Sequence, residues 1–269
     1  MTGHTDKYHS CEDASEYLVP LLNERDVFNT EVYTMGMTLH GGSIDFGRYD
    51  VVVLNINQVV WDEDVKSDFE KYVSSGGGLV VMHEADNAFP EWGEFNRMIG
   101  LGGWGDRDKS AGPYYYWKDG GFLKDFESSG PCGWHGQRVP FMINVRQPMH
   151  PIMKGLPSAW LHVNDELYGN LRGPVENMEV LATGFSDERT GGTGKEEPVS
   201  FTVAYGNGRV FHCVLGHTSK GDNVALKNVG YQLVYVRGVE WAATGEVTIE
   251  LPESLPSAES ALQRELLCD

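Results

Sequence analysis

Basic residues are few in this chain of 269 residues: 21 Lys and Arg stand against 39 Asp and Glu, and the formal net charge is -18. A field of this sign repels phosphate backbones, which makes nucleic acid a poor partner. A solvated, highly soluble surface explains the acidity without any ligand.

Cysteines are also few, and long apolar runs are absent. The four cysteines are scattered, with no C-x-x-C pair (Cys11, Cys132, Cys213 and Cys268). This excludes a zinc ribbon and argues against a disulfide framework at this chain length. No run approaches the ~18–20 apolar residues of a membrane span, and the N-terminus has no basic-then-apolar signal segment, so no membrane partner is expected.

What the sequence does contain is the pattern of a parallel α/β sheet. Residues 49–57 are a continuous β-branched run, typical of a strand buried on both faces. Residues 61–78 predict a helix with Asp62 as its cap and Gly76 as its stop, and residues 79–82 predict a second buried strand. Strand, helix and strand in this order predict a right-handed parallel crossover.

The N-terminal part predicts a helix at 10–25, capped by Ser10 and kinked or broken at Pro20, and then a strand at 30–35. A doubly wound sheet should open with a full strand, but only the end of one precedes this helix. We therefore expect either a shortened first strand or a record that lacks residues before Met1. The expected compartment is the cytoplasm, or the periplasm or exterior if a leader is missing.

Residues 100–137 are rich in glycine and aromatics without a helical or strand period. Because four consecutive aromatics argue against disorder, we expect an ordered insertion over the sheet edge. One domain is expected over residues 1–250, with a peripheral tail at 251–269. The other expected elements are strands at 138–145, 160–168 and 178–184, a hairpin at 198–217 with its turn at Asn207–Gly208, and a helix at 223–243.

Polar side chains recur where the predicted strands end. In open α/β sheets, ligands bind beyond the carboxyl ends of the strands, at the switch point of the winding. A site is therefore expected at this edge of the sheet. The residues predicted to lie there are His4, Asn55, Asn57, His83, Glu84 and His217.

Seven collinear segments within residues 1–248 resemble the ThuA family, the trehalose-utilisation protein A-like proteins. The segments are "YDVVVLN", "FEKYVSSGGGLVVMHEADNAF", "EFNRMIGLGGWG", "HPIMKGLPSAWLHVNDELY", "VLATG", "PVSFTVAYGNGRVFHCVLGH" and "GVEWAATG". The resemblance implies a flavodoxin-like fold with a doubly wound, mostly parallel sheet, related to class I glutamine amidotransferase domains. In those domains an elbow between a strand and a helix carries a nucleophilic cysteine. Here that position falls at or beside His83, so thiolate-dependent glutamine hydrolysis is not expected.

The family context implies sugar catabolism, with trehalose-like glycosides handled through 3-keto sugars. A neutral imidazole at His83 would take a proton from the carbon beside a keto group, or from a sugar hydroxyl. Glu84 would orient that imidazole only if a turn brought the two side chains to one face. A metal ligand and a satisfied structural histidine are the alternatives for His83.

Three further residues are candidates for catalysis. Asp165 and Glu166 are neighbours in a strand ending, where adjacent side chains diverge, so only one should face the site, and we favour Glu166. His135 lies in the insertion, from which a loop could carry it over the cleft, and His217 ends the hairpin. Each also has a plain structural interpretation as a hydrogen-bonded side chain.

Substrate contacts are predicted for a second set of residues. Polar side chains would bond sugar hydroxyls or an enediolate-like oxygen, and an aromatic ring would stack on a sugar face. For Glu84 the alternative is a salt bridge elsewhere, and for Trp104 it is packing or a dimer contact. The set comprises Asn55, Asn57, Glu84, Trp104 and His4, with His9 as the second histidine of the same loop.

No cofactor is predicted. His83, His135, His217 and Glu166 are metal-ligand types, but no H-x-E, H-x-x-x-H or H-E-x-x-H spacing supports a metal, and a divalent cation is left open. The leading hypothesis is an enzyme acting on a small-molecule carbohydrate by general acid/base chemistry, as an isomerase, lyase or hydrolase. A non-catalytic sugar-binding or regulatory module and a metal-dependent hydrolase are the alternatives. A homo-oligomer also stays open.

Overall fold

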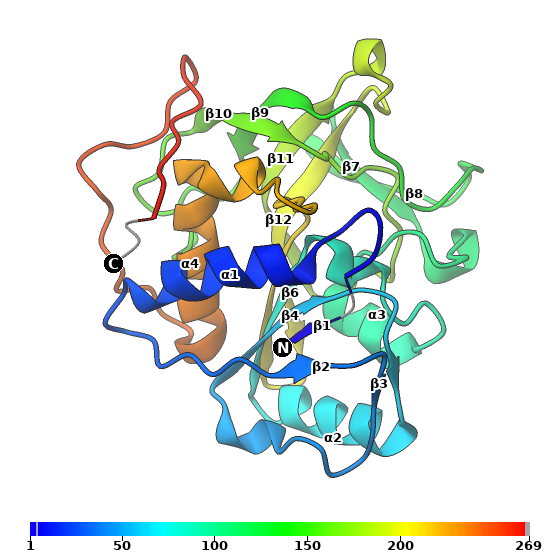
Figure 1. Cartoon of the computed structure of the whole chain (residues 1–269). Coiled ribbons are helices and arrows are strands. Elements are labelled where there is room, and N and C mark those ends of the chain that lie inside the picture. The colour runs from blue at the N-terminus through cyan, green and yellow to red at the C-terminus, as the bar shows by residue number, and fades with distance from the viewer. Residues whose placement is uncertain (4, 267–269) are drawn as a thin grey trace.

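The computed structural model describes residues 1–3 and 5–266, which are built around one large sheet (Figure 1). The strand order is β10-β9-β11-β12-β13-β6-β4-β1-β2. The strands from β13 to β2 run parallel, and the predicted flavodoxin-like α/β class is confirmed. The parallel strands are β13 (Gly208–Cys213), β6 (Gly78–Met82), β4 (Val51–Ile56), β1 (Thr2–Gly3) and β2 (Thr34–Met35).

The remainder of the sheet is antiparallel and continues from β13. It consists of β12 (Lys195–Tyr205), β11 (Met178–Ser186), β9 (Val139–Val145) and β10 (Ala159–Asp165). A hairpin of β7 (Tyr114–Lys118) and β8 (Gly121–Asp125) joins β12 through Trp117 and Glu196. A separate small parallel pair is formed by β3 (Thr38–Leu39) and β5 (Val60–Trp61).

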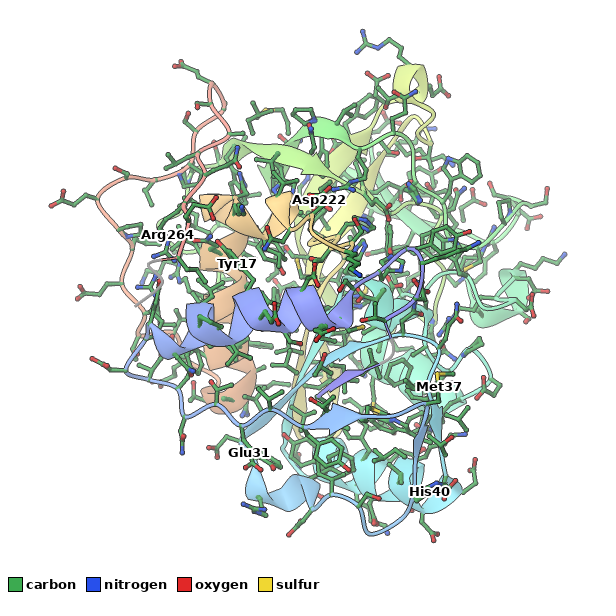
Figure 2. All side chains as sticks on the ribbon, viewed as in Figure 1. Tyr17, Glu31, Met37, His40, Asp222 and Arg264 are labelled. Carbon is green, nitrogen blue, oxygen red and sulfur yellow. The ribbon has the colours of Figure 1, made fainter. Side chains whose placement is uncertain are left out.

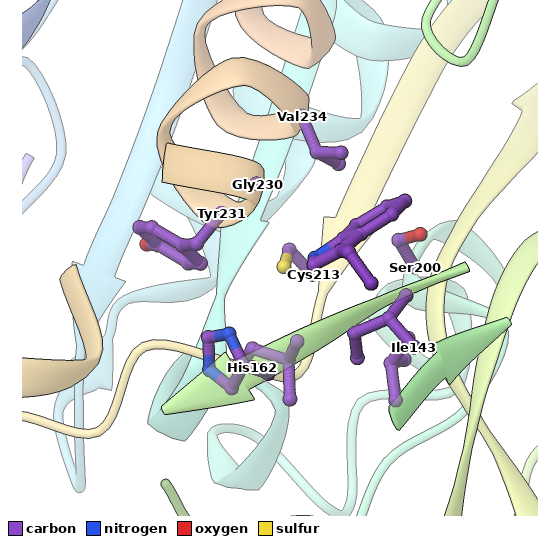
Figure 3. A pocket seen from close by; sticks show the side chains of 10 residues that line it. Ile143, His162, Ser200, Cys213, Gly230, Tyr231 and Val234 are labelled. Atoms are coloured by element: carbon purple, nitrogen blue, oxygen red, sulfur yellow. The ribbon is translucent and has the colours of Figure 1, made fainter. Parts of the chain in front are cut away.

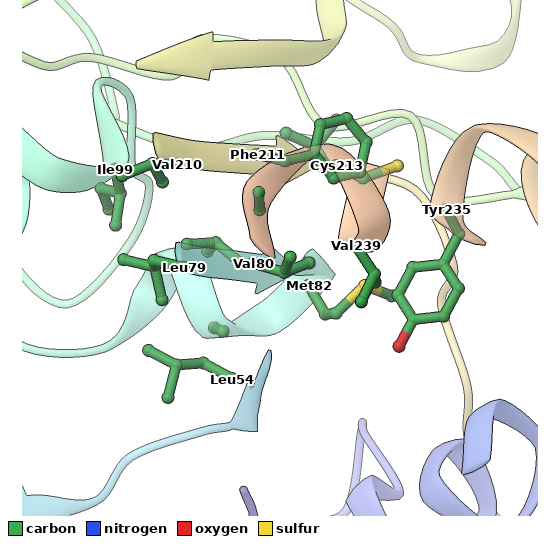
Figure 4. Packing of buried hydrophobic residues seen from close by; sticks show 14 of the residues in the cluster. Leu54, Leu79, Val80, Met82, Ile99, Val210, Phe211, Cys213, Tyr235 and Val239 are labelled. Carbon is green, nitrogen blue, oxygen red and sulfur yellow. The ribbon is translucent and has the colours of Figure 1, made fainter. Parts of the chain in front are cut away.

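Helices cover the sheet, and β6 is buried at every position as its apolar sequence predicts. Figure 4 shows side chains of β4, β6 and β13 meeting those of α3 and α4 in the core. The helices are α1 (Cys11–Asn23), α2 (Glu63–Ser74), α3 (Gly93–Ile99) and α4 (Val229–Thr244). Short 3-10 turns are η1 (Phe46–Arg48), η2 (His83–Asn87), η3 (Lys109–Ala111), η4 (Glu188–Thr190) and η5 (Val224–Lys227).

The helix caps differ in part from the sequence expectation. Ser10 caps α1 by accepting from Asp13 N, as predicted, and the helix runs unbroken through Pro20. Asp62 precedes α2 but makes no side-chain capping bond; its carboxylate instead lies 3.0 Å from His40 Nδ1. The C-terminal helix begins at Val229 and not at residue 223, because residues 224–227 form η5 and Asn228 caps α4.

Two β-structured regions also differ from the expectation. Strand β2 is shorter than predicted, and the turn between β12 and β13 consists of Gly206 and Asn207, one residue earlier than predicted. Gly206 has φ +58, a conformation that favours glycine at the first turn position. The insertion contains the β7–β8 hairpin, whose turn residues Asp119 and Gly120 both have positive φ. This Asp-Gly pair is a hairpin signal that the sequence interpretation missed.

Gly78 marks a close approach between β6 and α4. A Cβ atom at this position would lie 2.4 Å from Ala242 O and 3.0 Å from Asp50 O. Because both are backbone atoms that cannot rotate away, we expect Gly78→Ala to lower the free energy of unfolding by about 1–3 kcal/mol. Urea unfolding measures this effect.

Gly93→Ala is the matched control, since a Cβ at Gly93 meets nothing within 4 Å at the start of α3. Alanine also has a higher helix propensity than glycine, by up to about 1 kcal/mol. We therefore expect this variant to unfold at the same urea concentration as the wild type or a higher one. Equal stability of the two variants would contradict the close packing of β6 on α4.

The C-terminal segment after α4 lies along the outside of the domain. Tyr17 Oη of α1 donates to Arg264 O at 2.9 Å, and both residues are labelled in Figure 2. Val229 N donates to Leu262 O at 2.9 Å, which ties the same segment to the start of α4. Within residues 1–3 and 5–266, no helix has both the length and the apolar character needed to cross a membrane.

Candidate functional site

Four side chains from separate parts of the chain meet beyond the carboxyl ends of β6 and β13. His83 directly follows β6, His217 lies in the segment after β13, Glu166 directly follows β10, and His9 lies in the loop between β1 and α1. One imidazole nitrogen or carboxylate oxygen of each residue lies within 4.8 Å of those of the others. All four residues are buried, and we call them the histidine–glutamate cluster.

His83 occupies a sharp turn from strand to 3-10 helix. Its φ is +37, a region that residues other than glycine rarely adopt and that costs on the order of 1–3 kcal/mol. This turn carries the side chain out of a strand buried on both faces. A polar residue can therefore follow the apolar run 79–82 without lying in the core.

The ring orientation of His83 is set by the backbone. Its Nδ1 lies 2.7 Å from Val214 O, and since a carbonyl only accepts, Nδ1 carries a hydrogen. The other nitrogen, Nε2, therefore faces the cluster. It lies 2.9 Å from Tyr168 Oη, 3.3 Å from His217 Nδ1 and 3.7 Å from Glu166 Oε2.

Electrostatics set the protonation of the cluster. Burial lowers the pKa of His83, but the hydrogen bond with Glu166 and the charges of Glu84 and Glu166 outweigh it and raise this pKa to about 9. Burial raises the pKa of Glu166, yet His217 and His83 hold it far below its usual range. The pair is therefore an imidazolium and a carboxylate at neutral pH, and not the neutral imidazole expected from the sequence. Burial and the neighbouring His83 and His217 lower the pKa of His9 to about 3, so that ring is neutral.

Asp165 and Glu166 diverge at the end of β10, where the pairing with β9 shifts register. The Asp165 carboxylate accepts from the backbone N of Gly216 at 2.9 Å, of His217 at 3.0 Å and of Glu166 at 2.8 Å. It also lies 2.9 Å from His162 Nε2. Asp165 thus anchors the segment that presents His217, and Glu166 is the carboxylate that enters the cluster.

Two predicted residues border the cluster from the insertion. His135 Nε2 lies 3.8 Å from Glu166 Oε2, and the His135 side chain is 38% exposed. The ring of Trp104 lies 4.5 Å from that of Tyr168 and 6.4 Å from that of His135, measured between centroids. Residues 100–137 therefore supply the solvent side of the cluster.

The two predicted asparagines, Asn55 and Asn57, lie outside the cluster. Asn57 supports it indirectly: its amide donates to Asp6 Oδ2 at 2.9 Å in the loop that carries His9. The amide of Asn55 donates to Cys11 O and Ser15 Oγ, both at 2.8 Å, and so holds the start of α1.

Glu84 is buried beside α1 and accepts from Cys11 Sγ at 3.4 Å. Burial raises the pKa of its carboxyl group. His4, the remaining substrate-contact residue predicted from the sequence, lies outside the described residues.

Tyr168 and His9 are the members of the site that sequence reasoning missed or ranked low. The Tyr168 hydroxyl lies 2.9 Å from His83 Nε2 and 3.2 Å from His9 Nε2, and its ring stacks on that of His83 at 4.2 Å. Burial raises the pKa of Tyr168 well above its ordinary value, so its hydroxyl stays protonated. The signal for Tyr168 is its position in the same strand ending as Glu166, "NDELY".

Two cavities elsewhere in the described part of the chain are not lined by the histidine–glutamate cluster. Figure 3 shows one lined by core residues such as Ile143 and Cys213; its volume of about 10 Å³ is too small for a sugar. The other, of about 570 Å³, opens beside Asp50, Tyr72 and Gly77, next to the amino ends of β4 and β6. It lies at the opposite edge of the parallel strands from the histidine–glutamate cluster.

The fold and the cluster define a flavodoxin-like α/β protein with histidines and a carboxylate at its strand ends. The chain belongs to the ThuA family, described as trehalose utilisation, which matches residues 1–242. This membership indicates a role related to trehalose utilisation. Comparison with curated proteins found no match.

Solved structures agree with this assignment. A ThuA-like protein from Parabacteroides merdae is 40% identical, covers 97% of this chain and 95% of its own, and superposes with a TM-score of 0.88. A ThuA-like protein from Bacteroides uniformis is 19% identical, over 91% of this chain and 90% of its own, with a TM-score of 0.56. A cytoplasmic protein from Salmonella typhimurium is 14% identical, over 85% and 86%, with a TM-score of 0.50. The last two show similarity of fold alone.

Proposed function

We propose that this protein is an enzyme of sugar catabolism that moves protons on a keto-glycoside or trehalose-like sugar. The observation that carries the proposal is the buried contact between His83 and Glu166, whose Nε2 and Oε2 atoms lie 3.7 Å apart. Such a pair lies where ligands bind in this class of fold, beyond the strand ends. The description of the family as trehalose utilisation supports a sugar as the substrate.

The proposed chemistry begins at a carbon beside a carbonyl group. Removing a proton from that carbon places negative charge on the carbonyl oxygen, which needs hydrogen-bond donors nearby. The Glu166 carboxylate would accept this proton and the His83 imidazolium would return one, while the Tyr168 hydroxyl, 2.9 Å from His83 Nε2, would donate to the oxygen. Isomerisation and elimination both start with this step.

Substrate would approach from the side of the insertion. Trp104 offers an aromatic face against which the C–H face of a sugar ring would stack. His135, 3.8 Å from Glu166 and partly exposed, is placed to exchange a proton with a sugar hydroxyl at the same side.

Proton exchange in deuterated water tests the proposal. The protein is incubated with 3-keto disaccharides and, separately, with their parent sugars, with and without divalent cations. We expect deuterium to replace hydrogen beside the keto group, seen by nuclear magnetic resonance, and the parent sugars to stay unlabelled. Binding measured by calorimetry with neither exchange nor product would contradict the proposal and would support the non-catalytic sugar-binding module.

His135→Ala is expected to lower turnover of a responsive keto sugar by about 10²-fold, the lower end of the range for acid/base residues. The melting temperature should not change, because the side chain is partly exposed and its Nδ1 bonds the neighbouring Gly136 O at 2.9 Å. Steady-state kinetics and thermal unfolding measure the two effects. Unchanged kcat would remove His135 from the proposed mechanism.

A further inference from the structure

We infer that the histidine–glutamate cluster binds one first-row divalent cation, zinc or a close neighbour, through His9, His83, His217 and Glu166. The inference rests on the proposed function for the place where chemistry occurs. With a cation bound, the proton exchange assigned to His83 and Glu166 would pass to Tyr168 and His135, which are not among the four ligands. The inference assigns metal coordination to the four side chains, a role that no spacing motif in the sequence indicates.

The distances within the cluster are those of a coordination shell. Zinc binds imidazole nitrogen and carboxylate oxygen at about 2.0–2.2 Å, so two ligands at a tetrahedral angle lie roughly 3.4 Å apart. His217 Nδ1 lies 3.2 Å from Glu166 Oε2 and 3.3 Å from His83 Nε2, and the separation between His83 and Glu166 is 3.7 Å. With His9 included, all four ligand atoms stay within 4.8 Å of one another.

The outward-facing nitrogens also fit coordination. A metal-bound histidine usually donates its other N–H to a carbonyl or carboxylate, which fixes the ring. His83 does so through Nδ1 to Val214 O at 2.7 Å. His9 turns Nε2 towards Tyr168 at 3.2 Å, and its outward Nδ1 lies 3.8 Å from Asp6 Oδ1, beyond a direct hydrogen bond.

The donor atoms of the cluster converge on one another. His83 Nε2 and His217 Nδ1 face each other at 3.3 Å, and they lie 3.7 Å and 3.2 Å from Glu166 Oε2. A divalent cation gives all four donor atoms one common partner.

The donor set selects the kind of cation. Three imidazoles and one carboxylate suit zinc and other first-row divalent ions, whereas magnesium and calcium prefer oxygen ligands throughout. The Tyr168 hydroxyl lies at the edge of the cluster, 2.9 Å from His83 Nε2 and 3.2 Å from His9 Nε2. With the cation bound, Tyr168 and His135 remain free to bond the substrate and exchange protons.

Metal content and metal binding test the inference without any sugar. Untagged protein is purified without chelator, its metals are counted by mass spectrometry, and the metal-stripped protein is titrated with zinc and manganese. We expect close to one cation per chain, and a melting temperature about 5–10 °C higher at a hundredfold excess over Kd. Glu166→Gln and His217→Ala should lose most of this shift.

His40→Ala is the matched control, since His40 lies outside the cluster on the surface beside Asp62, with its side chain 72% exposed (Figure 2). This variant should bind the cation as the wild type does. Circular dichroism of the metal-stripped variants checks that each is folded, and Glu166→Gln stands in if His217→Ala unfolds. Substoichiometric metal, or a shift that Glu166→Gln retains in full, would overturn the inference.

The two proposals fail separately. If the cation binds and the cluster variants lose it, but no keto sugar exchanges its protons, the metal site stands and the proposed function is wrong. Proton exchange by a protein that takes up neither zinc nor manganese in the titration would keep the proposed function and remove the metal site.

Discussion

Replacing His83 with alanine is expected to lower turnover of a 3-keto disaccharide by about 10²–10⁴-fold. The reason is geometric: His83 Nε2 is the atom that contacts Tyr168 Oη, His217 Nδ1 and Glu166 Oε2, at 2.9, 3.3 and 3.7 Å. Alanine removes this common contact and leaves the Glu166 carboxylate without its proton partner at the end of β6. Initial rates with saturating substrate measure the loss.

The control for this prediction is His40→Ala, which should keep wild-type turnover because His40 is exposed, contacts Asp62 and is not a member of the cluster. Proton transfer and cation binding both predict the loss in His83→Ala, and zinc titration of the same variant separates them. A His83→Ala protein that turns over keto sugars at the wild-type rate would end the assignment of His83 as the central residue.

Asp165→Ala is expected to lower the free energy of unfolding by about 3–5 kcal/mol, because it leaves several buried donors without their carboxylate acceptor. The Asp165 carboxylate is the acceptor for the backbone N–H groups of Gly216, His217 and Glu166, and it contacts His162. Since all four residues are buried, alanine leaves these donors without a partner and without water. The melting temperature should fall by roughly 10 °C.

Two comparisons isolate the cause of this loss. Asp165→Asn keeps the volume and one acceptor oxygen and should lose about half as much stability as alanine. Asp68→Ala removes an exposed carboxylate that pairs with Lys71 at 3.1 Å on α2, and it should change the stability by less than about 0.5 kcal/mol. Wild-type stability of Asp165→Ala would show that Asp165 is not the anchor of the His217 segment.

Local sequence patterns predicted much of the parallel half of the sheet. The β-branched runs at 49–57 and 79–82 became β4 and β6, because a strand covered on both faces needs apolar residues throughout. His83 follows β6 directly, so its position at the strand end could also be predicted from the sequence. The errors fell on short-range details, such as the start of α4 and the β12–β13 turn, where one capping or turn residue shifts a boundary.

The contacts between the site residues were harder to predict from the sequence. Glu166 ends β10, the outermost strand of the antiparallel half, and it reaches His217 because Asp165 bonds the segment after β13. His9 and Tyr168 are far apart in sequence, and only the folded chain places the Tyr168 hydroxyl between His9 and His83. Contacts of this kind leave no periodic signal, because they depend on strand order and on loops that pack across the sheet edge.

The sequence by itself therefore determined the α/β class, the buried strand that ends at His83, and the family resemblance. These features depend on periods of two to four residues or on collinear segments, which a chain shows without its partners. The tertiary structure alone decided that His83 has a positive φ and that it shares a cluster with His9, Glu166 and His217. Strand order and loop packing, set by burial of the whole sheet, bring one nitrogen or oxygen atom of each of these four side chains within 4.8 Å of the others.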